Sequence, residues 1–395
     1  MAVVVRGIRL ARFGSAVAVA LVSSVHITLA GAVIALTSPF GSTADPMIDR
    51  VLRERLLSRP LCVVAIAGDP STESIRLLLD RFQRRAGREA ITVFDSNGVD
   101  ARSSELPETV AALARCGGVI IAGSDPSRLI QTLRPGGRDS GLLRGVRALL
   151  GAGGVVVGLD VMATSLGDAR IVSGSSRDAM RYGVVDRPDQ QGLVLENGLG
   201  LAPHLLFDIG CSSRGYVGRS MVALAEQREL QFGIGMDESS AVVLVNDVWE
   251  ILGDAPLLIL DTSHAGHWND GTGIRSGELW LLTAGDRFEK ATNTARAAMA
   301  KLPLGPTRRR PRIPEDPWAP TAFLHLLAGT ASLGEAQLKI PTPGRMLALR
   351  VTTATSVAGL RGRDAAGLRR GFFAGPIAWD LVELSLPSET SPDER

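Results

Sequence analysis

Short apolar runs alternate with amphipathic stretches from about residue 58 onwards. Continuous apolar runs in 61–66 (LCVVAI), 91–95 (ITVFD) and 118–125 (GVIIAGSD) are typical of strands buried on both faces. The stretch 71–87 carries apolar residues at helical spacing, and further helices are predicted near 105–116 and 139–151. Pro126 suits the first turn of another helix. This alternation predicts an α/β fold with a parallel-rich central sheet and helices on both faces.

The second half of the chain is richer in strand patterns, at 230–247, 255–262 and 277–286. Asp286, followed three residues later by Glu289, predicts the start of a helix that runs to Lys301. We therefore expect an α/β domain over 45–301. The Pro- and Arg-rich stretch 302–320 is interpreted as a solvated linker. A folded C-terminal extension, 321–395, follows and ends in polar residues expected to fray.

The first 44 residues have the pattern of an export segment. Arg6, Arg9 and Arg12 precede an apolar run, 13–36, that contains no Asp, Glu, Lys or Arg. This order predicts a signal peptide or signal anchor that is not packed against the fold. Ser42-Thr43-Ala44 provides small residues at the positions a signal peptidase reads, whereas the run is long enough to span a bilayer. Cleavage and membrane anchoring through 13–36 both stay open.

Composition narrows the classes of partner and site. Hydrophobic residues make up 45% and charged residues 21%, an ordinary globular balance. A net charge of +2 and an aromatic content of 4% argue against nucleic acid, which would need a basic field or stacking rings. The cysteines, Cys62, Cys116 and Cys211, are odd in number and lack a C-x-x-C pair. This excludes a disulfide framework, and Cys62 and Cys116 are interpreted as small core residues.

We predict no cofactor and no metal site. Two histidines, His264 and His267, lie three residues apart with Asp261 and Asp270 nearby. Zinc accepts such ligands, but the spacing fixes no third one. These residues are therefore interpreted as parts of a polar loop.

Candidate chemistry lies where predicted strands end, because ligands of parallel sheets bind at the carboxyl ends of strands. Asp125 follows one strand, and Asp160 follows the strand within GGVVVGLDVMA, residues 153–163. The frame Gly158-Leu159-Asp160-Val161-Met162 is similar to the G-x-S-x-G turn that presents a nucleophile. An aspartate stands at its tip. Met162 replaces the second glycine, which predicts a relaxed turn.

A longer pattern, residues 198–244, resembles the cyanophycinase family of serine peptidases. The family shows GLGL, then D-Q-H-F-S-x-R-G-R-x-x-R, then G-I-G-I-D-E-x-T-A. This sequence keeps GLGL, then Asp208, Ser212, Arg214, Gly215 and Arg219, then GIGMDESSA at 233–241. Upstream, GVIIAGSD resembles the family's strand followed by G-G-D-Q, and GGVVVGLDVMA takes the place of G-G-V-x-x-G-T-S-A-G-A. The resemblance covers roughly residues 60–295.

The resemblance implies a fold related to class I glutamine amidotransferases and a serine triad that releases β-Asp-Arg dipeptides from cyanophycin. It assigns the nucleophile position to Asp160, the acid position to Asp178 and the histidine position to Gly210. Pro126 stands where the family has the glutamine of its substrate pocket. A serine needs an adjacent base, and Gly210 has no side chain to move a proton. Ser165, in the ATSLG frame, is the alternative nucleophile.

We therefore expect a cyanophycinase-like protein that has lost triad hydrolysis and acts as an exported binding or structural module. The alternative is an active hydrolase of the same kind with rearranged catalytic residues. Asp125, Asp208, Arg214 and Arg219 are the candidates for binding a peptide or a small carboxylate. A structural ion pair between Asp208 and an arginine is an equal alternative. Homodimer formation also stays open.

Overall fold

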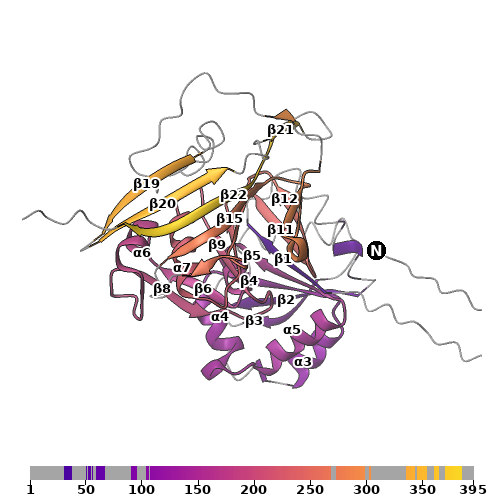
Figure 1. Cartoon of the computed structure of the whole chain (residues 1–395). Coiled ribbons are helices and arrows are strands. Elements are labelled where there is room, and N and C mark those ends of the chain that lie inside the picture. Colours follow the sequence, from indigo (N-terminus) through magenta and orange to yellow (C-terminus); the bar gives the residue numbers. More distant parts are fainter. Residues whose placement is uncertain are drawn as a thin grey trace, which may run out of the picture.

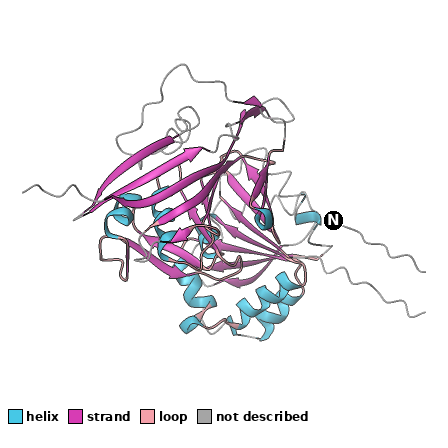
Figure 2. Ribbon diagram, viewed as in Figure 1, coloured by secondary structure: helices cyan, strands magenta, loops and turns pink. Residues whose placement is uncertain are grey.

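The computed structural model describes residues 31–37, 50, 52–54, 56, 59–66, 90–95, 104–105, 107–267, 273–298, 302–303, 335–342, 345–353, 360–363 and 370–384. Two large β-sheets lie at its centre, with helices on the outside (Figures 1 and 2). We call them the first sheet and the second sheet. Their facing sides share one hydrophobic core.

The first sheet has the order β17-β16-β12-β11-β1-β5-β4-β2-β3. Its parallel half consists of β1 (Ala32–Leu36), β5 (Val155–Leu159), β4 (Gly118–Gly123), β2 (Leu61–Ile66) and β3 (Ala90–Asp95). Its antiparallel half consists of β11 (Ser240–Val245), β12 (Val248–Gly253), β16 (Arg287–Glu289) and β17 (Thr294–Arg296). The predicted runs at 61–66, 91–95 and 118–125 therefore form neighbouring parallel strands.

Helices cover both faces of this sheet. One face packs against α3 (Pro107–Ala114), α4 (Pro126–Leu133) and α5 (Gly141–Gly151), which lie below the sheet in Figure 1. On the other face, the helical residues Leu52 and Leu56 pack with Ile34 and Val157. The predicted α/β architecture is thus confirmed, with β5 as an interior strand between β1 and β4. The helix predicted over 71–87 lies outside the described residues.

The second sheet has the order β18-β21-β22-β15-β13-β10-β9-β6-β8-β7, with β14 paired to β15 and β19 and β20 joined through β22. The strands are β6 (Ala169–Ser173), β7 (Val184–Val185), β8 (Leu193–Asn197), β9 (Leu205–Ile209), β10 (Phe232–Met236), β13 (Leu257–Asp261), β14 (Gly266–His267), β15 (Ile274–Leu282), β18 (Leu302–Pro303), β19 (Glu335–Thr342), β20 (Arg345–Thr353), β21 (Leu360–Arg363) and β22 (Arg370–Leu384). Two helices, α6 (Ser176–Tyr182) and α7 (Val217–Glu226), contribute to the core on its outer side.

The C-terminal extension continues this second sheet. β22 pairs with β15 in antiparallel register, and β20 pairs with β22. Leu349 and Trp379 are buried in the same core as Leu206 and Met221. The described strands of the extension are therefore part of the main domain. In the stretch interpreted as a linker, Leu302 and Pro303 form β18, and residues 304–320 lie outside the described residues.

An aromatic cluster joins the two sheets. The rings of Phe232 (β10) and Trp249 (β12) meet edge to face with centroids 5.2 Å apart, and Phe288 (β16) lies 5.1 Å from Trp249. Trp280 (β15) completes the cluster, 6.0 Å from Phe288. Contacts of this kind add roughly 0.5–1.5 kcal/mol each beyond the burial of their area.

Residues 31–37 correct the prediction that the first 44 residues stay outside the fold. AVIAL forms β1, which pairs with β5 on one side and β11 on the other, and none of its residues is more than 7% exposed. A strand buried on both faces has the same apolar composition as a membrane segment, so the pattern alone did not separate them. A membrane anchor cannot include residues 32–36. Residues 1–30 and 38–49 lie outside the described residues.

None of the helices that the structure describes is both long and apolar enough to cross a membrane.

The helix predicted from Asp286 to Lys301 is wrong over the described residues. This stretch forms β16, a short 3₁₀ turn, η4 (Lys290–Thr292), and β17. The Asp286 carboxylate accepts hydrogen bonds from the backbone N–H groups of Thr283 and Ala298, and so ties the two ends of a hairpin together. Phe288 is fully buried in the aromatic cluster. Tertiary packing, and not the local sequence pattern, therefore determines the secondary structure of this segment.

Cys62 and Cys116 also differ from the prediction of free core residues. Their sulfur atoms form a disulfide, with Cα atoms 5.9 Å apart. Cys62 lies in β2, and Cys116 lies two residues before the adjacent strand β4. This Cα separation is ordinary for a disulfide.

The position of β1 makes a direct prediction about truncated chains. A chain lacking residues 1–44 loses a central strand and should be insoluble or melt without a cooperative transition. A chain lacking only residues 1–30 should melt cooperatively, because both pairings of β1 are kept. Circular dichroism melts compare the cooperativity of unfolding of the two chains, and gel filtration compares their solubility. Equal melting temperatures would contradict the central position of β1.

Candidate active site and the vacant histidine position

Asp160 stands on a strained turn at the carboxyl end of β5. It opens a 3₁₀ turn, η3 (Asp160–Ser165), and its φ is +51°. A positive φ costs a residue with a side chain on the order of 1–3 kcal/mol and is typical of functional turns. The prediction that Met162 relaxes this turn is therefore wrong. Met162 is fully buried in the core between the sheets, so its bulk lies away from the tip of the turn.

Thr37 lies beside the turn at Asp160, which we call the elbow, and the apolar pattern of residues 13–36 does not indicate this position. Leu36 pairs with Leu159, so Thr37 and Asp160 follow the ends of adjacent parallel strands. The Thr37 hydroxyl donates to the backbone oxygen of Asp237 over 2.6 Å. This bond fastens the β10–β11 connection to the elbow edge of the first sheet.

The loop that carries Gly210 is held at the same edge through Asp237. The Asp237 carboxylate accepts hydrogen bonds from the backbone N–H groups of Ser212 and Ser213 and from the Ser213 hydroxyl, the last two over 2.9 and 2.7 Å. β9 and β10 are parallel and end together at Ile209 and Met236. Asp237 therefore tethers the loop that carries Gly210 to the end of β10.

Asp178 occupies the first turn of α6. The Ser175 hydroxyl accepts a bond from the Asp178 N–H and lies 2.7 Å from Asp178 Oδ2, to which it donates. The next residue, Ser176, donates to the backbone oxygen of Gly215 over 2.6 Å. The start of α6 therefore meets the loop that follows Gly210. The structure thus gathers the nucleophile, acid and histidine positions at one end of the sheets.

The histidine position is vacant and closed. Gly210 has a φ of +89°, and a Cβ added to it would lie 2.8 Å from Cδ of Arg214. The aliphatic stem of Arg214 therefore fills the space next to Gly210. A histidine here would have to displace Arg214 and adopt a backbone conformation that glycine favours.

The described histidines lie at the other end of the second sheet. His204 directly precedes β9, and its ring nitrogen Nδ1 lies 3.0 Å from the backbone oxygen of Glu229. His264 and His267 follow Asp261, which pairs with Phe232 at the start of β10. Gly210 follows the end of β9, so none of these three can replace its missing side chain. His325 lies outside the described residues.

Within the described part of the chain, the two other candidate nucleophiles, Ser165 and Cys211, lack a neighbouring base that would take their proton. Ser165 is fully buried, and its Oγ has no hydrogen-bond partner among the described residues. Cys211 is also buried, and burial raises the pKa of its thiol well above the usual range. The carboxylates of Asp208 and Asp237 raise it further. The thiol therefore stays protonated and is a poor nucleophile.

Asp208 and Arg219 form a buried ion pair, which decides between their two predicted roles. Arg219 Nε donates to Asp208 Oδ2 over 2.9 Å, and the Ser220 hydroxyl donates to the same oxygen over 2.8 Å. The Arg219 side chain is only 13% exposed and the Asp208 side chain only 3%. Arg219 also donates to the Gly174 backbone oxygen and lies 3.5 Å from the centre of the Tyr216 ring. These groups are satisfied within the fold, so the pair is structural.

The same contacts explain the electrostatics of this pair. Burial by itself would lower the pKa of Arg219, but the adjacent Asp208 carboxylate and its hydrogen bonds outweigh burial and raise it. Asp125 is also engaged, since it caps α4 by accepting from the Arg128 N–H over 3.0 Å. Of the four residues predicted to bind a ligand, Asp125 and Arg214 are exposed, whereas Asp208 and Arg219 are not.

Asp261 and Glu278 bring two carboxylates together near His264. No group of three His, Cys, Asp or Glu side chains among the described residues could hold a metal ion, and Asp270 lies outside them. Asp261 pairs directly across the strands with Glu278, and burial raises the pKa of both carboxyl groups.

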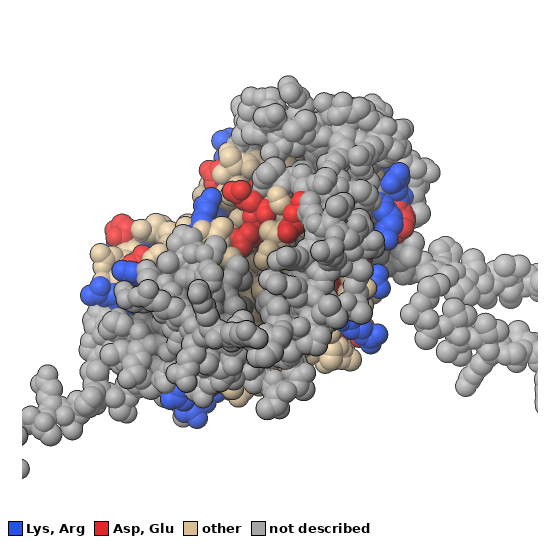
Figure 3. Space-filling model, turned by 90° about the horizontal axis from the view of Figure 1, so that it is seen from above, with Lys and Arg blue, Asp and Glu red and all other residues tan. Residues whose placement is uncertain are grey.

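The surface of the protein carries both positive and negative charges. On the face in Figure 3, acidic side chains gather near the centre and basic ones lie towards the margins.

Comparison with known proteins shows which of them this chain resembles. The chain is 26% identical to a cyanophycinase from Nostoc over 231 residues, which cover 56% of this chain and 72% of the relative. It is also 26% identical to a cyanophycinase from Synechococcus elongatus over 238 residues, 58% of this chain and 69% of the relative. No protein-family model matches the chain. A solved peptidase structure from an acI-B1 actinobacterium aligns over 66% of this chain and 98% of its own, with a TM-score of 0.46 and 18% identity.

The structural role of Asp208 is open to a stability test. Asp208→Ala should lower the free energy of unfolding by about 3–5 kcal/mol, because it leaves the Arg219 guanidinium buried without a counter-ion. Asp189→Ala is the matched control, since its pair with Arg187 is 69% and 74% exposed and should contribute less than about 1 kcal/mol. Urea unfolding measures both. Equal losses in the two variants would contradict a structural pair.

Proposed function

Since the chain is a divergent cyanophycinase-like protein, we propose that it keeps the fold but has lost triad hydrolysis. We propose that it serves instead as an exported binding or structural module. The observation that carries this is the closed histidine position. Gly210 has no side chain, and the stem of Arg214 occupies the space where one would begin. A triad without its base cannot activate a hydroxyl nucleophile.

An aspartate at the elbow does not restore the reaction. Attack by the Asp160 carboxylate on a peptide carbonyl would need no base, but it would form a mixed anhydride and break the C–N bond. The departing amine needs a proton from a general acid, and water that hydrolyses the anhydride needs a base; in the family the histidine serves both steps. The described histidines lie at the opposite end of the second sheet. The amine would therefore have no proton donor, and the first step would already be blocked.

The second candidate is an active hydrolase with rearranged residues, and the geometry of the elbow favours it. Asp160 keeps a positive φ, although nothing in an inert loop would require that strain. Ser165 is the residue that such a rearrangement would use. Its burial and its lack of a base weigh against this candidate.

The disulfide supports the proposal of export. Disulfides persist in oxidising compartments and are rare in the cytosol. Cys62 and Cys116 are paired in the core of the first sheet. The pair therefore fits a protein that folds after leaving the cytosol.

The position of β1 changes where we propose the export signal to end. Cleavage after Ala44 would remove β1 from the sheet. Thr28-Leu29-Ala30 also provides small residues at the two positions a signal peptidase reads, and cleavage there leaves β1 intact. The apolar core of the leader then shortens to 13–22, which suits a signal peptide better than a membrane span. We therefore propose that the leader ends at Ala30.

Loss of the triad predicts a protein that releases no dipeptide from cyanophycin or from β-Asp-Arg substrates above the blank. Removing triad members lowers turnover by about a million-fold in a working serine hydrolase. Asp160→Ser should not rescue activity. Asp160→Ser combined with Gly210→His should not rescue it either, because residue 210 has a φ of +89° and meets Arg214. Turnover by the unaltered chain that Ser165→Ala abolishes would establish the second candidate instead.

Export makes a separate prediction about the start of the mature chain. The chain expressed with its own leader should be recovered outside the cytosol, with Gly31 as its first residue. Intact-mass and N-terminal peptide mass spectrometry identify that residue. A chain that begins at Asp45 would contradict the proposed end of the leader, and an unprocessed chain in the cytosol would contradict export itself.

A further inference from the structure

A cavity lies at the edge of the first sheet opposite to Asp160. It measures about 430 Å³ and opens where β1 begins, where α5 ends and where β11 turns into β12. Asp160 follows the carboxyl end of β5, one strand length away. Cavities of about 300–1,000 Å³ are typical of sites for small molecules. This one is separate from the elbow and from the residues that surround Gly210.

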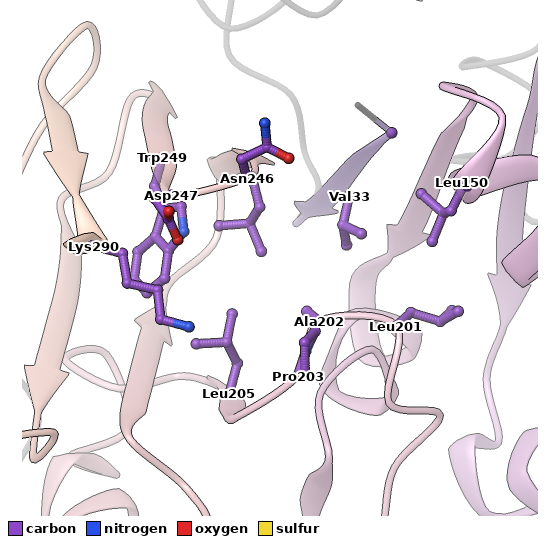
Figure 4. A pocket seen from close by; sticks show the side chains of 13 residues that line it. Val33, Leu150, Leu201, Ala202, Pro203, Leu205, Asn246, Asp247, Trp249 and Lys290 are labelled. Atoms are coloured by element: carbon purple, nitrogen blue, oxygen red, sulfur yellow. The ribbon is translucent and has the colours of Figure 1, made fainter. Parts of the chain in front are cut away.

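The walls of the cavity are mostly apolar, but one wall carries two opposite charges. The apolar lining is Val33, Leu150, Leu201, Ala202, Pro203, Leu205, Leu244 and Trp249. Figure 4 shows Lys290 Nζ directed into the cavity above Leu205, with the Asp247 carboxylate beside Trp249 on the same wall. The Lys290 N–H donates to the backbone oxygen of Asp247 over 2.7 Å, so the two residues are fixed side by side.

Neither charge is neutralised by an ion pair within the described part of the chain. Lys290 Nζ lies 5.5 Å from the centre of the Phe232 ring, and no described residue accepts a hydrogen bond from it. The positive charge of Lys290 stabilises the buried Asp261 carboxylate only at a distance, since the two form no salt bridge. Asp247 is exposed at the rim and is in no salt bridge among the described residues. The Lys290 ammonium and the Asp247 carboxylate therefore lie at one end of an apolar cavity, where both are available to a ligand.

We propose that this cavity binds a small zwitterion with an apolar side chain, which is the chemistry of a free apolar α-amino acid. The ligand's carboxylate meets Lys290, its ammonium meets Asp247, and its side chain lies among Leu201, Leu205 and Trp249. Hydrogen bonds to charged groups give such a ligand its orientation, and the apolar wall excludes ligands with a charged side chain. This site goes beyond the proposed function, because a hydrolytic or a non-hydrolytic chain could carry it.

The test compares three ligands, two of which each lack one of leucine's charges, and two variants that each lack one charge of the cavity. L-Leucine is the zwitterionic probe, 4-methylpentanoate lacks its ammonium, and 3-methylbutylamine lacks its carboxylate. Isothermal titration of the full chain, purified from the fraction in which it accumulates, should show leucine binding more tightly than either analogue. Lys290→Met should weaken leucine about 10-fold or more, and Asp247→Asn should weaken it by a smaller factor because Asp247 is exposed.

The crossed measurements make the assignment specific. Lys290→Met should leave the affinity for 3-methylbutylamine unchanged, and Asp247→Asn should leave that for 4-methylpentanoate unchanged. Arg287→Gln is the control, since Arg287 is exposed on β16, pairs with Glu250 outside the cavity and should not alter leucine binding. Melting curves without ligand confirm that each variant folds. The proposal is overturned if leucine, methionine and phenylalanine all fail to bind at 10 mM, or if Lys290→Met leaves leucine binding unchanged.

Discussion

The pairing of β1 between β5 and β11 is the constraint on which the rest of the structure depends. It is the one place where the parallel half of the first sheet joins the antiparallel half. Because Leu36 pairs with Leu159, the chain that leaves β1 runs beside the elbow, and the Thr37 hydroxyl there holds the backbone of Asp237. Through Asp237, the loop after Gly210 is fixed at the same edge. The strand that resembles a leader therefore positions the candidate site.

The candidate site shows that architecture and chemistry are supported by different contacts. The elbow has a strained turn, and Asp208 and Arg219 form a buried ion pair. Neither feature depends on a side chain at Gly210. The loss of the base that we propose would therefore leave the fold intact. A cavity at the opposite edge, beside Lys290, is independent of all of these residues.

Apolar runs predicted most of the first sheet, because a short continuous apolar run such as 61–66 usually forms a buried strand. Three features could not be predicted from such patterns. Residues 32–36 have the composition of a membrane segment, and only pairing with β5 and β11 shows them to be a strand. Asp286 caps a hairpin where its spacing to Glu289 predicts a helix. The disulfide requires that β2 and β4 be neighbours, which no spacing in the sequence shows. In the site, the family resemblance assigned positions 160, 178 and 210, and the buried contacts of Asp208 could not be predicted from it.

A serine-directed fluorophosphonate shows whether a base acts on residue 160. The reagent labels a serine quickly only when a neighbouring base takes its proton. If no such base is present, Asp160→Ser is labelled no faster than the same chain unfolded in urea, at every pH from 6 to 9. Rapid labelling at position 160, confirmed by peptide mass spectrometry and rising through a pH near 7, would contradict the absence of a base, because another residue would then serve as one.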